Sequence, residues 1–388
     1  MRKIILGILT LALMPACGFG AELGTLLRDE FAAAISSYPA GRQVLSDLRE
    51  HLRAGADLPE IEIIDDKSSF LGWFYDSDWT VKLNSRFAAS FLHMKGGARA
   101  VSARLAADPA ARRRLVAAAD VLVLHELVHA YQTVKCPACM LRLNGKKPVE
   151  FEYEAYLRQA MYLHEKLLSR PRLLRNYLNS GAVNPYLESA LVSYITLSLS
   201  REEYKKSILE RYSAEENYSL VTVSSETAVS EYSAYVDDFY KSKWPAFSVQ
   251  ALEFLGDNAV KTRHYQLALK CLAVAEATAK ENGVSAEELH GLQLRGVQAM
   301  MTVRDYFKDN GKYLRAPDAA ELLVALEQAH EKTSRPFPRD LQGYRNKIYR
   351  RALPVFARRL AKAKDPDTKK YLRELHDYIA AHIPTDKS

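Results

Sequence analysis

Residues 121–133 of the 388-residue chain read VLVLHELVHAYQT, and this stretch decides how the rest of the sequence is interpreted. It is apolar before and between its polar residues, as expected of a helix buried in a protein core. His125 and His129 lie four residues apart, so a helix places both imidazoles on one face, about one turn apart. Burying two histidines and Glu126 is costly unless a metal or close polar partners compensate them. We therefore predict a buried metal-binding helix; a hydrogen-bonded pair of core histidines is the alternative.

The spacing of these residues suits zinc chemistry. Imidazoles one turn apart can bind a single Zn²⁺ ion. Glu126 lies about 100° around the helix from His125, which places its carboxylate beside a metal-bound water rather than on the metal. Zinc acidifies such a water and polarises the carbonyl under attack, while the glutamate accepts the proton. His125 and His129 are thus predicted zinc ligands and Glu126 the catalytic base.

A catalytic zinc site needs a third protein ligand. The histidine that metzincins place six residues after the second ligand is missing, because Lys135 occupies that position. Residues 150–156 read EFEYEAY and supply Glu150, Glu152 and Glu154 on the next predicted helix. Glu150 and Glu154 share one helical face, whereas Glu152 points elsewhere, as expected of a solvated acidic residue.

Residues 124–132, LHELVHAYQ, resemble the active helix of gluzincin-type bacterial metallopeptidases. Many of these continue with a Glu-x-Glu-Ala segment whose second glutamate is the ligand, and residues 152–155 match that segment. The resemblance implies that Glu154 is the third ligand, with Glu150 as a supporting residue or the alternative ligand. It also implies a zincin-like core in which an edge strand within 70–83 binds extended peptide by strand addition. It covers residues 58–160 and says nothing of substrate preference.

The remaining pattern predicts a mainly helical α+β protein. Residues 60–64 alternate as a strand does, and the runs 70–75 and 79–83 flank a natural turn, so we expect a small antiparallel sheet. Helical periodicity is expected over residues 22–58, 98–107 and 110–133, and again from about residue 149. The expected domains are a zincin-like catalytic domain over 22–170, a helical extension over 171–245 and an all-α domain over 246–388.

The last expected domain shows a weak repeat pattern and a basic end. Residues 255–275 resemble a tetratricopeptide repeat, in which small residues such as Gly256 and Ala259 let two helices pack closely. An ordinary helical hairpin is the alternative. Residues 331–388 hold 15 Lys and Arg against 7 Asp and Glu, which accounts for the net charge of +7. A solvated basic face explains this excess, and an anionic envelope surface or acidic partner is the alternative.

The first 20 residues have the layout of a bacterial secretory signal, with Arg2 and Lys3 before an apolar run. We expect export to the periplasm or envelope, which argues against a nucleic-acid partner. Residues 14–17, MPAC, loosely resemble a lipobox, so a lipid anchor at Cys17 and ordinary signal cleavage both stay open. No second apolar run is long enough to span a membrane. Outside the cytoplasm, Cys136 and Cys139 are expected to form a local disulfide, which leaves Cys271 as a buried thiol.

Three functions agree with these patterns. The first is a zinc peptidase that hydrolyses protein or peptide in the cell envelope, and the intact Glu126 favours it because a scaffold needs no general base. The second is a metal-containing binding protein whose C-terminal helices dock envelope partners. The third is a zinc amidase that acts on cell-wall peptides, since both hydrolases attack an amide.

Overall fold

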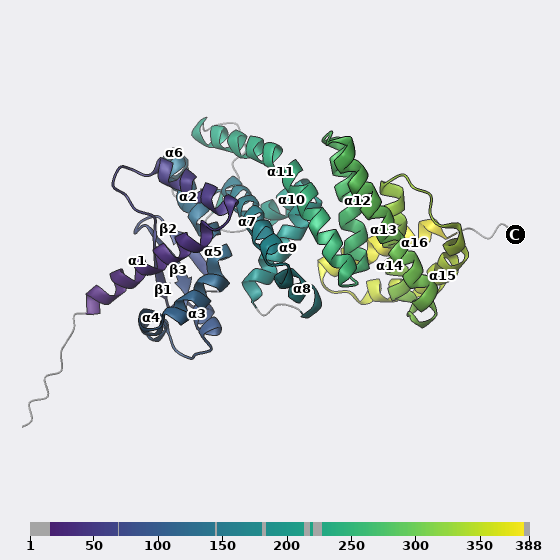
Figure 1. Cartoon of the computed structure of the whole chain (residues 1–388), viewed down its shortest axis with the longest axis horizontal. Helices are drawn as coiled ribbons and strands as arrows, with labels where there is room; N and C mark the ends of the chain where they lie inside the picture. Colours follow the sequence, from purple (N-terminus) through teal and green to yellow (C-terminus); the bar gives the residue numbers. More distant parts are fainter. Residues whose placement is uncertain are drawn as a thin grey trace, which may run out of the picture. The chain divides into compact units, whose positions relative to one another are not determined.

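The computed structural model describes residues 16–68, 70–143, 146–180, 184–212, 218–219 and 227–383. Residues 1–15, with most of the expected signal sequence, lie outside this set, and so does the side chain of Cys17. The described chain is mainly helical with a small sheet, which confirms the mainly helical α+β class (Figure 1). It divides into two compact units, residues 1–165 with 212–233 and residues 166–211 with 234–388.

The first unit gathers helices around a small sheet. Its helices are α1 (Ala16–Ile35), α2 (Pro39–His51), α3 (Ser85–Leu92), α4 (Ala98–Ala107), α5 (Pro109–Lys135), α6 (Pro137–Arg142) and most of α7 (Val149–Ser169). Its strands are β1 (Glu60–Ile64), β2 (Gly72–Tyr75), β3 (Thr80–Asn84), β4 (Lys147–Pro148) and β5 (Tyr218–Ser219). Helices α1, α2, α3 and α4 all contact α5, so α5 is the central element of this unit.

The three-stranded sheet is mixed, so the prediction of an antiparallel sheet was wrong in part. The hairpin formed by β2 and β3 is antiparallel, with Phe74 opposite Val81, and the acidic turn at 76–78 joins the two strands as expected. However, β1 pairs in parallel with β3, which gives the order β1-β3-β2. The hairpin turn is encoded locally, whereas the pairing of β1 depends on how the chain crosses over to reach β2. Consequently β2, not β3, lies at the sheet edge.

Helix α5 begins and stays buried for reasons visible in its sequence. Asp108 is the N-cap and accepts hydrogen bonds from the N–H groups of Ala110 and Ala111 at 2.8 and 3.2 Å. Pro109 follows at the first helical position, where its missing N–H costs nothing. From residue 119 to residue 132 every side chain is buried, as the apolar sequence on all faces predicts. The histidine-bearing stretch is therefore enclosed by protein.

The second unit is an array of helices. They are α8 (Pro171–Ser180), α9 (Pro185–Leu199), α10 (Arg201–Tyr212), α11 (Thr227–Lys261), α12 (Tyr265–Glu281), α13 (Ala286–Asn310), η1 (Gly311–Tyr313), α14 (Ala316–Lys332), α15 (Arg339–Lys362) and α16 (Pro366–His382). Helix α11 begins in the first unit and continues in the second. Gly256 on α11 packs against Leu272 on α12 so closely that a Cβ would lie 2.6 Å from the leucine Cγ. This close contact explains why position 256 holds a small residue.

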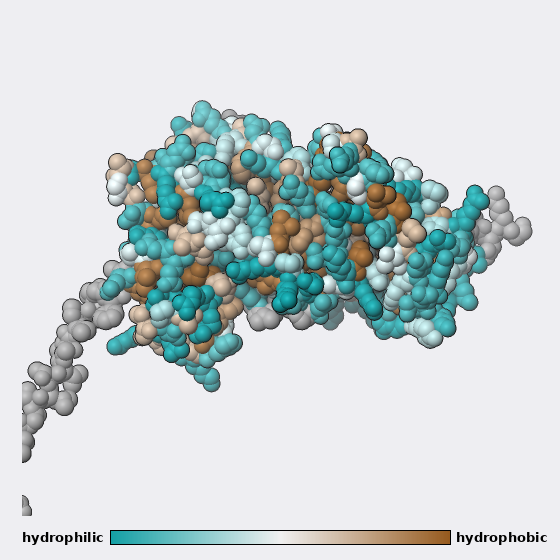
Figure 2. Space-filling view, in the orientation of Figure 1, coloured by the Kyte–Doolittle hydropathy of each residue, from teal (hydrophilic) through white to brown (hydrophobic). Residues whose placement is uncertain are grey.

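The core of the second unit joins α12 to α16 through buried aliphatic and aromatic side chains, among them Leu323, Tyr349 and Phe356. Residues 212–233 lie with the first unit, so the expected extension over 171–245 is divided between the two units. Figure 2 shows that hydrophobic side chains also reach the surface over the C-terminal helices. Among the described residues, no helix combines the length and apolar composition that a membrane span needs.

Candidate metal centre

Helices α5 and α7 form the framework of the site and pack antiparallel. Tyr162 Oη donates to Asp120 Oδ2 at 2.8 Å towards one end of the pair. Gln132 Nε2 donates to the carbonyl oxygen of Phe151 at 2.7 Å towards the other end. Residue numbers rise along one helix as they fall along the other, so the start of α7 lies beside the histidines of α5.

His125, His129 and Glu152 converge between these helices and form what we call the donor cluster. The two Nε2 atoms lie 3.2 Å apart, Glu152 Oε1 lies 3.2 Å from His129 Nε2, and Oε2 lies 3.4 Å from His125 Nε2. One ligand atom from each residue lies within 4.8 Å of the others, and all three residues are buried. The donor cluster can therefore hold a metal ion.

The charges of the donor cluster depend on one another. Burial opposes ionisation of Glu152, yet the imidazoles of His129 and His125 hold the pKa of this carboxyl well below its usual range. Burial likewise disfavours the protonated form of His125, but the Glu152 carboxylate outweighs burial and raises the pKa of the imidazole. Glu152 is thus an anion at neutral pH, which is the form a metal ligand requires.

Gln132 sets the orientation of His129. Its amide nitrogen faces the Phe151 carbonyl, which only accepts, so its Oε1 is the atom 2.8 Å from His129 Nδ1. That oxygen also only accepts, so Nδ1 carries a proton, and Nε2, which faces Glu152, is the ring atom left to bind a metal once it is deprotonated. A hydrogen bond of this kind fixes the tautomer and ring position of a metal-binding histidine. Sequence reasoning missed this role, although Gln132 lies one turn beyond His129.

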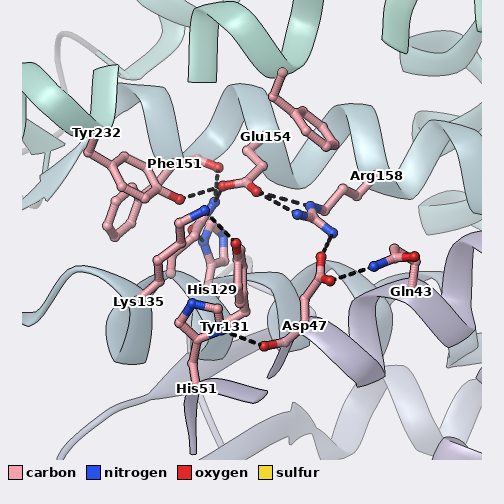
Figure 3. A network of polar contacts seen from close by, with 12 residues as sticks. Gln43, Asp47, His51, His129, Tyr131, Lys135, Phe151, Glu154, Arg158 and Tyr232 are labelled. Carbon is pink, nitrogen blue, oxygen red and sulfur yellow. Dashed lines mark hydrogen bonds and ion pairs between the residues drawn. The ribbon is translucent and has the colours of Figure 1, made fainter. Parts of the chain in front are cut away.

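Glu154, the predicted third ligand, lies in a different set of contacts (Figure 3). Its Oε1 accepts from Arg158 Nε and Nη2 at 3.0 and 2.9 Å, and its Oε2 accepts from Tyr232 Oη. Gln132 Nε2 also reaches Oε2 at 3.3 Å, and Arg158 Nη1 continues to Asp47 Oδ2 at 2.6 Å. The structure thus brings Glu152, not Glu154, to the histidines. The prediction for Glu154 is corrected accordingly.

The positions of the side chains around α7 explain why Glu152, and not Glu154, lies beside the histidines. Ala155, which is fully buried, and Tyr162 share a face with Glu152, because they follow it by three and ten residues. Glu154 lies about 200° around the helix from Glu152 and faces α2 and the start of α11. Glu150 shares the face of Glu154 rather than that of Glu152, and it is not among the residues of the donor cluster. Glu152, and not Glu154, therefore lies on the face of α7 that Ala155 and Tyr162 share.

Glu126 lies beside the edge of the sheet. Its Oε2 accepts a hydrogen bond from the backbone N–H of Phe74 at 2.8 Å, and the contact is buried. Strand β2 pairs with β3 on its other side, so this N–H belongs to the free edge of the sheet. The predicted catalytic base thus contacts the strand expected to receive an extended peptide, and only β2 of that segment occupies an edge.

Compared with known proteins, the chain matches no family model, no curated protein and no solved structure. The donor cluster and its surroundings are therefore the features of the chain that indicate a function. Cys136 and Cys139 form a disulfide just after α5, with an S–S distance of 2.02 Å, and Cys271 is a buried free thiol.

Two further residues of α7 differ in what they contribute. The Tyr156 ring lies edge-on to the His125 ring with centroids 4.7 Å apart, and its hydroxyl is 3.0 Å from the hydroxyl of Tyr212. His164 is buried, and burial lowers the pKa of its imidazole to about 4. Tyr156 is therefore the aromatic hydroxyl residue placed against a ligand, and His164 is a neutral core residue.

Proposed function

We propose that the chain is a zinc-dependent peptidase of the bacterial envelope, with His125, His129 and Glu152 as zinc ligands and Glu126 as general base. The observation that carries this proposal is the convergence of two imidazole Nε2 atoms and one carboxylate between α5 and α7. Two histidines and one glutamate form a known donor set of catalytic zinc sites. The HExxH spacing and the resemblance to gluzincins favour the same chemistry.

The chemistry follows from where the side chains lie. Bound zinc would polarise the scissile carbonyl and make a water molecule acidic. Glu126 would then accept the proton of that water, and Gln132 would keep the Nε2 lone pair of His129 towards the metal. Extended substrate would lie along β2, whose edge N–H at Phe74 now binds Glu126. Substrate and catalytic base therefore meet at the same strand.

The experiment compares the wild type with Glu126→Gln. Both proteins are expected to bind one zinc ion per chain, because Glu126 is not among the three donors. The substitution keeps an oxygen to accept from Phe74, and we expect it to reduce cleavage of a diverse peptide library by roughly 10²–10⁴-fold. Glu253→Gln, a change on α11 in the second unit, is the matched control and should cleave normally. Zinc binding without cleavage by the wild type would contradict the proposal.

Burial favours a second candidate, a structural metal site in a binding protein. The exposed fractions of His125, His129 and Glu152 are 7%, 3% and 2%. Structural zinc sites are closed, whereas catalytic sites keep one coordination position open. Cobalt substitution separates the two candidates, because an open site changes its visible spectrum when acetohydroxamate is added and a closed site does not. Digesting purified cell wall and casein side by side would separate an amidase from a peptidase.

A further inference from the structure

The second unit contains a pocket with no part in the proposed zinc chemistry. It has a volume of about 480 Å³ and is lined by residues of α13, α14, α15 and the turn before α15, namely Val297, Met300, Met301, Arg304, His330, Arg335, Pro338, Arg339 and Asp340. Pockets that enclose small ligands have volumes of roughly 300–1,000 Å³. The pocket is therefore large enough for a small organic molecule.

One wall of the pocket is apolar and exposed. Val297 and Met301 lie on α13 one turn apart, and 37% and 54% of their surfaces are exposed. Leu294 precedes Val297 by three residues and is 57% exposed, so an apolar stripe continues along the same helical face. Methionine side chains adapt to ligands of different shapes because they are flexible and polarizable. This wall suits an alkyl or aliphatic group.

The polar part of the pocket wall is formed by His330 and the guanidinium groups. His330 is only 8% exposed, and neither of its ring nitrogens has a hydrogen-bond partner among the described residues. A buried polar group of this kind is normally hydrogen-bonded. Both nitrogens have almost no exposed surface, so a ligand would contact them only if the ring turned towards the pocket. Burial, and then the charge of Arg335, lowers the pKa of His330, so the ring is neutral and has one N–H to donate.

The guanidinium groups of the pocket wall favour an anionic ligand. Arg335 Nη1 is paired with the buried Glu276 Oε2 at 2.8 Å, and Arg304 Nη2 is paired with Asp340 Oδ2 at 2.6 Å. Arg339 has no ion pair among the described residues, so one cation of the wall is left without a carboxylate. Guanidinium groups bind carboxylates through two parallel hydrogen bonds.

We propose that this pocket binds a small monocarboxylate with an apolar body, whose alkyl part contacts Val297 and Met301 and whose carboxylate contacts Arg339. Two sources share this chemistry, a medium-chain fatty acid and the free C-terminus of a short apolar peptide. The proposal is independent of the zinc centre, because all lining residues belong to the second unit.

The test uses calorimetry on the full chain with octanoate and with N-acetyl-Leu-Leu bearing a free carboxylate. We expect at least one of them to bind, and its neutral amide to bind roughly tenfold or more weakly, because a hydrogen bond to a charged group is lost. Binding of octanoate would identify the fatty-acid source, and binding of the dipeptide the peptide source. Absence of binding by both acids, or equal binding of acid and amide, would overturn the proposal.

Two variants locate the binding. Arg339→Gln should weaken the carboxylate roughly tenfold or more and leave the amide unchanged. Arg358→Gln changes an exposed arginine on the same helix outside the pocket and should leave both unchanged. Met301→Glu should weaken both acid and amide, because it places a charge in the apolar wall, and it should weaken the acid more, because the new carboxylate repels the ligand. Equal losses for Arg339→Gln and Arg358→Gln would show non-specific attraction to the basic helix and contradict the proposal.

Discussion

Two carboxylates of α7, two residues apart, face different surroundings and show what distinguishes a candidate metal site from a structural network. Glu154 is paired with the Arg158 guanidinium, whose charge is permanent, and accepts from Tyr232 as well. Glu152 faces two imidazoles, whose charge can be given up. The first arrangement is complete with protein groups alone. The second places three atoms with lone pairs around one point, which is what a cation requires.

The largest difference between the two carboxylates is expected in zinc affinity when each one is neutralised in turn. Glu152→Gln removes a charged ligand, so we expect zinc affinity to fall more than roughly 100-fold. The corresponding change in free energy is a modest part of the binding free energy of a structural zinc site. Glu154→Gln should reduce affinity only about tenfold, as loss of a supporting partner does. Competition with a chromophoric chelator measures both dissociation constants.

Without metal, Glu154→Gln should destabilise the protein more than Glu152→Gln does. Glu154→Gln removes one of the two carboxylates that the buried Arg158 contacts, so we expect the free energy of unfolding to fall by about 3 kcal/mol. Glu152→Gln should change it little, because the two imidazoles that Glu152 faces can lose their charge. Urea unfolding measures both values. The assignment of ligands would be reversed if Glu154→Gln lost the metal and Glu152→Gln kept it.

A second test contrasts two histidines buried in the same unit. A carboxylate raises the pKa of His125, whereas burial alone lowers that of His164 to about 4. The unfolded chain binds a proton to His164 near pH 6.5, so the contribution of this residue to stability is complete above pH 6.5. It is lost as pH falls towards 4, at about 1.4 kcal/mol per pH unit and roughly 3 kcal/mol in all.

Substitution isolates this contribution from those of other titrating groups. The difference in unfolding free energy between the wild type and His164→Leu should change by roughly 3 kcal/mol between pH 7 and pH 4. His290→Leu, at an exposed position of α13, should give no such change. A constant difference for His164→Leu across this range would show that the folded protein protonates His164 as easily as the unfolded chain.

Local signals explain how much of the fold and the site could be predicted from sequence. The Asp108-Pro109 start of α5, its apolar faces and the acidic turn before β3 are encoded by neighbouring residues, and these elements form where expected. The parallel pairing of β1 depends on a crossover between distant residues, which periodicity does not reveal.

The site shows the same division between local and distant information. The four-residue spacing of His125 and His129 determines that their imidazoles meet. The third donor depends on which face of α7 contacts α5, and a motif resemblance selected the wrong face. A close helix contact at Ala155 agrees with Glu152, which lies one turn before it, but this small residue alone does not identify the ligand. The partners Asp47 and Tyr232 come from distant segments that no motif connects.

A smaller loss of zinc affinity is expected when Gln132, which orients His129, is changed. Gln132→Met keeps the length of the side chain but removes the acceptor for His129 Nδ1, so zinc affinity should fall about tenfold. The neighbouring change Thr133→Val is the control, because its hydroxyl binds only the His129 carbonyl oxygen at 3.0 Å. Zinc competition measures both variants. Equal affinities for Gln132→Met and the wild type would show that the imidazole is held by packing alone.

The smallest effect on zinc affinity should come from removing the disulfide. This change tests whether the disulfide supports the donor cluster or only the contacts of Glu154. Cys136 and Cys139 lie beside Ala228 at the start of α11, the helix that brings Tyr232 to Glu154. Because the bond closes a very short loop, the double change to serine should reduce the free energy of unfolding by at most about 2 kcal/mol. Zinc affinity should stay within about threefold of the wild type, because the change loosens only an outer partner of the site. A larger loss of zinc would mean that the end of α5, and not α7 alone, holds the donor cluster together.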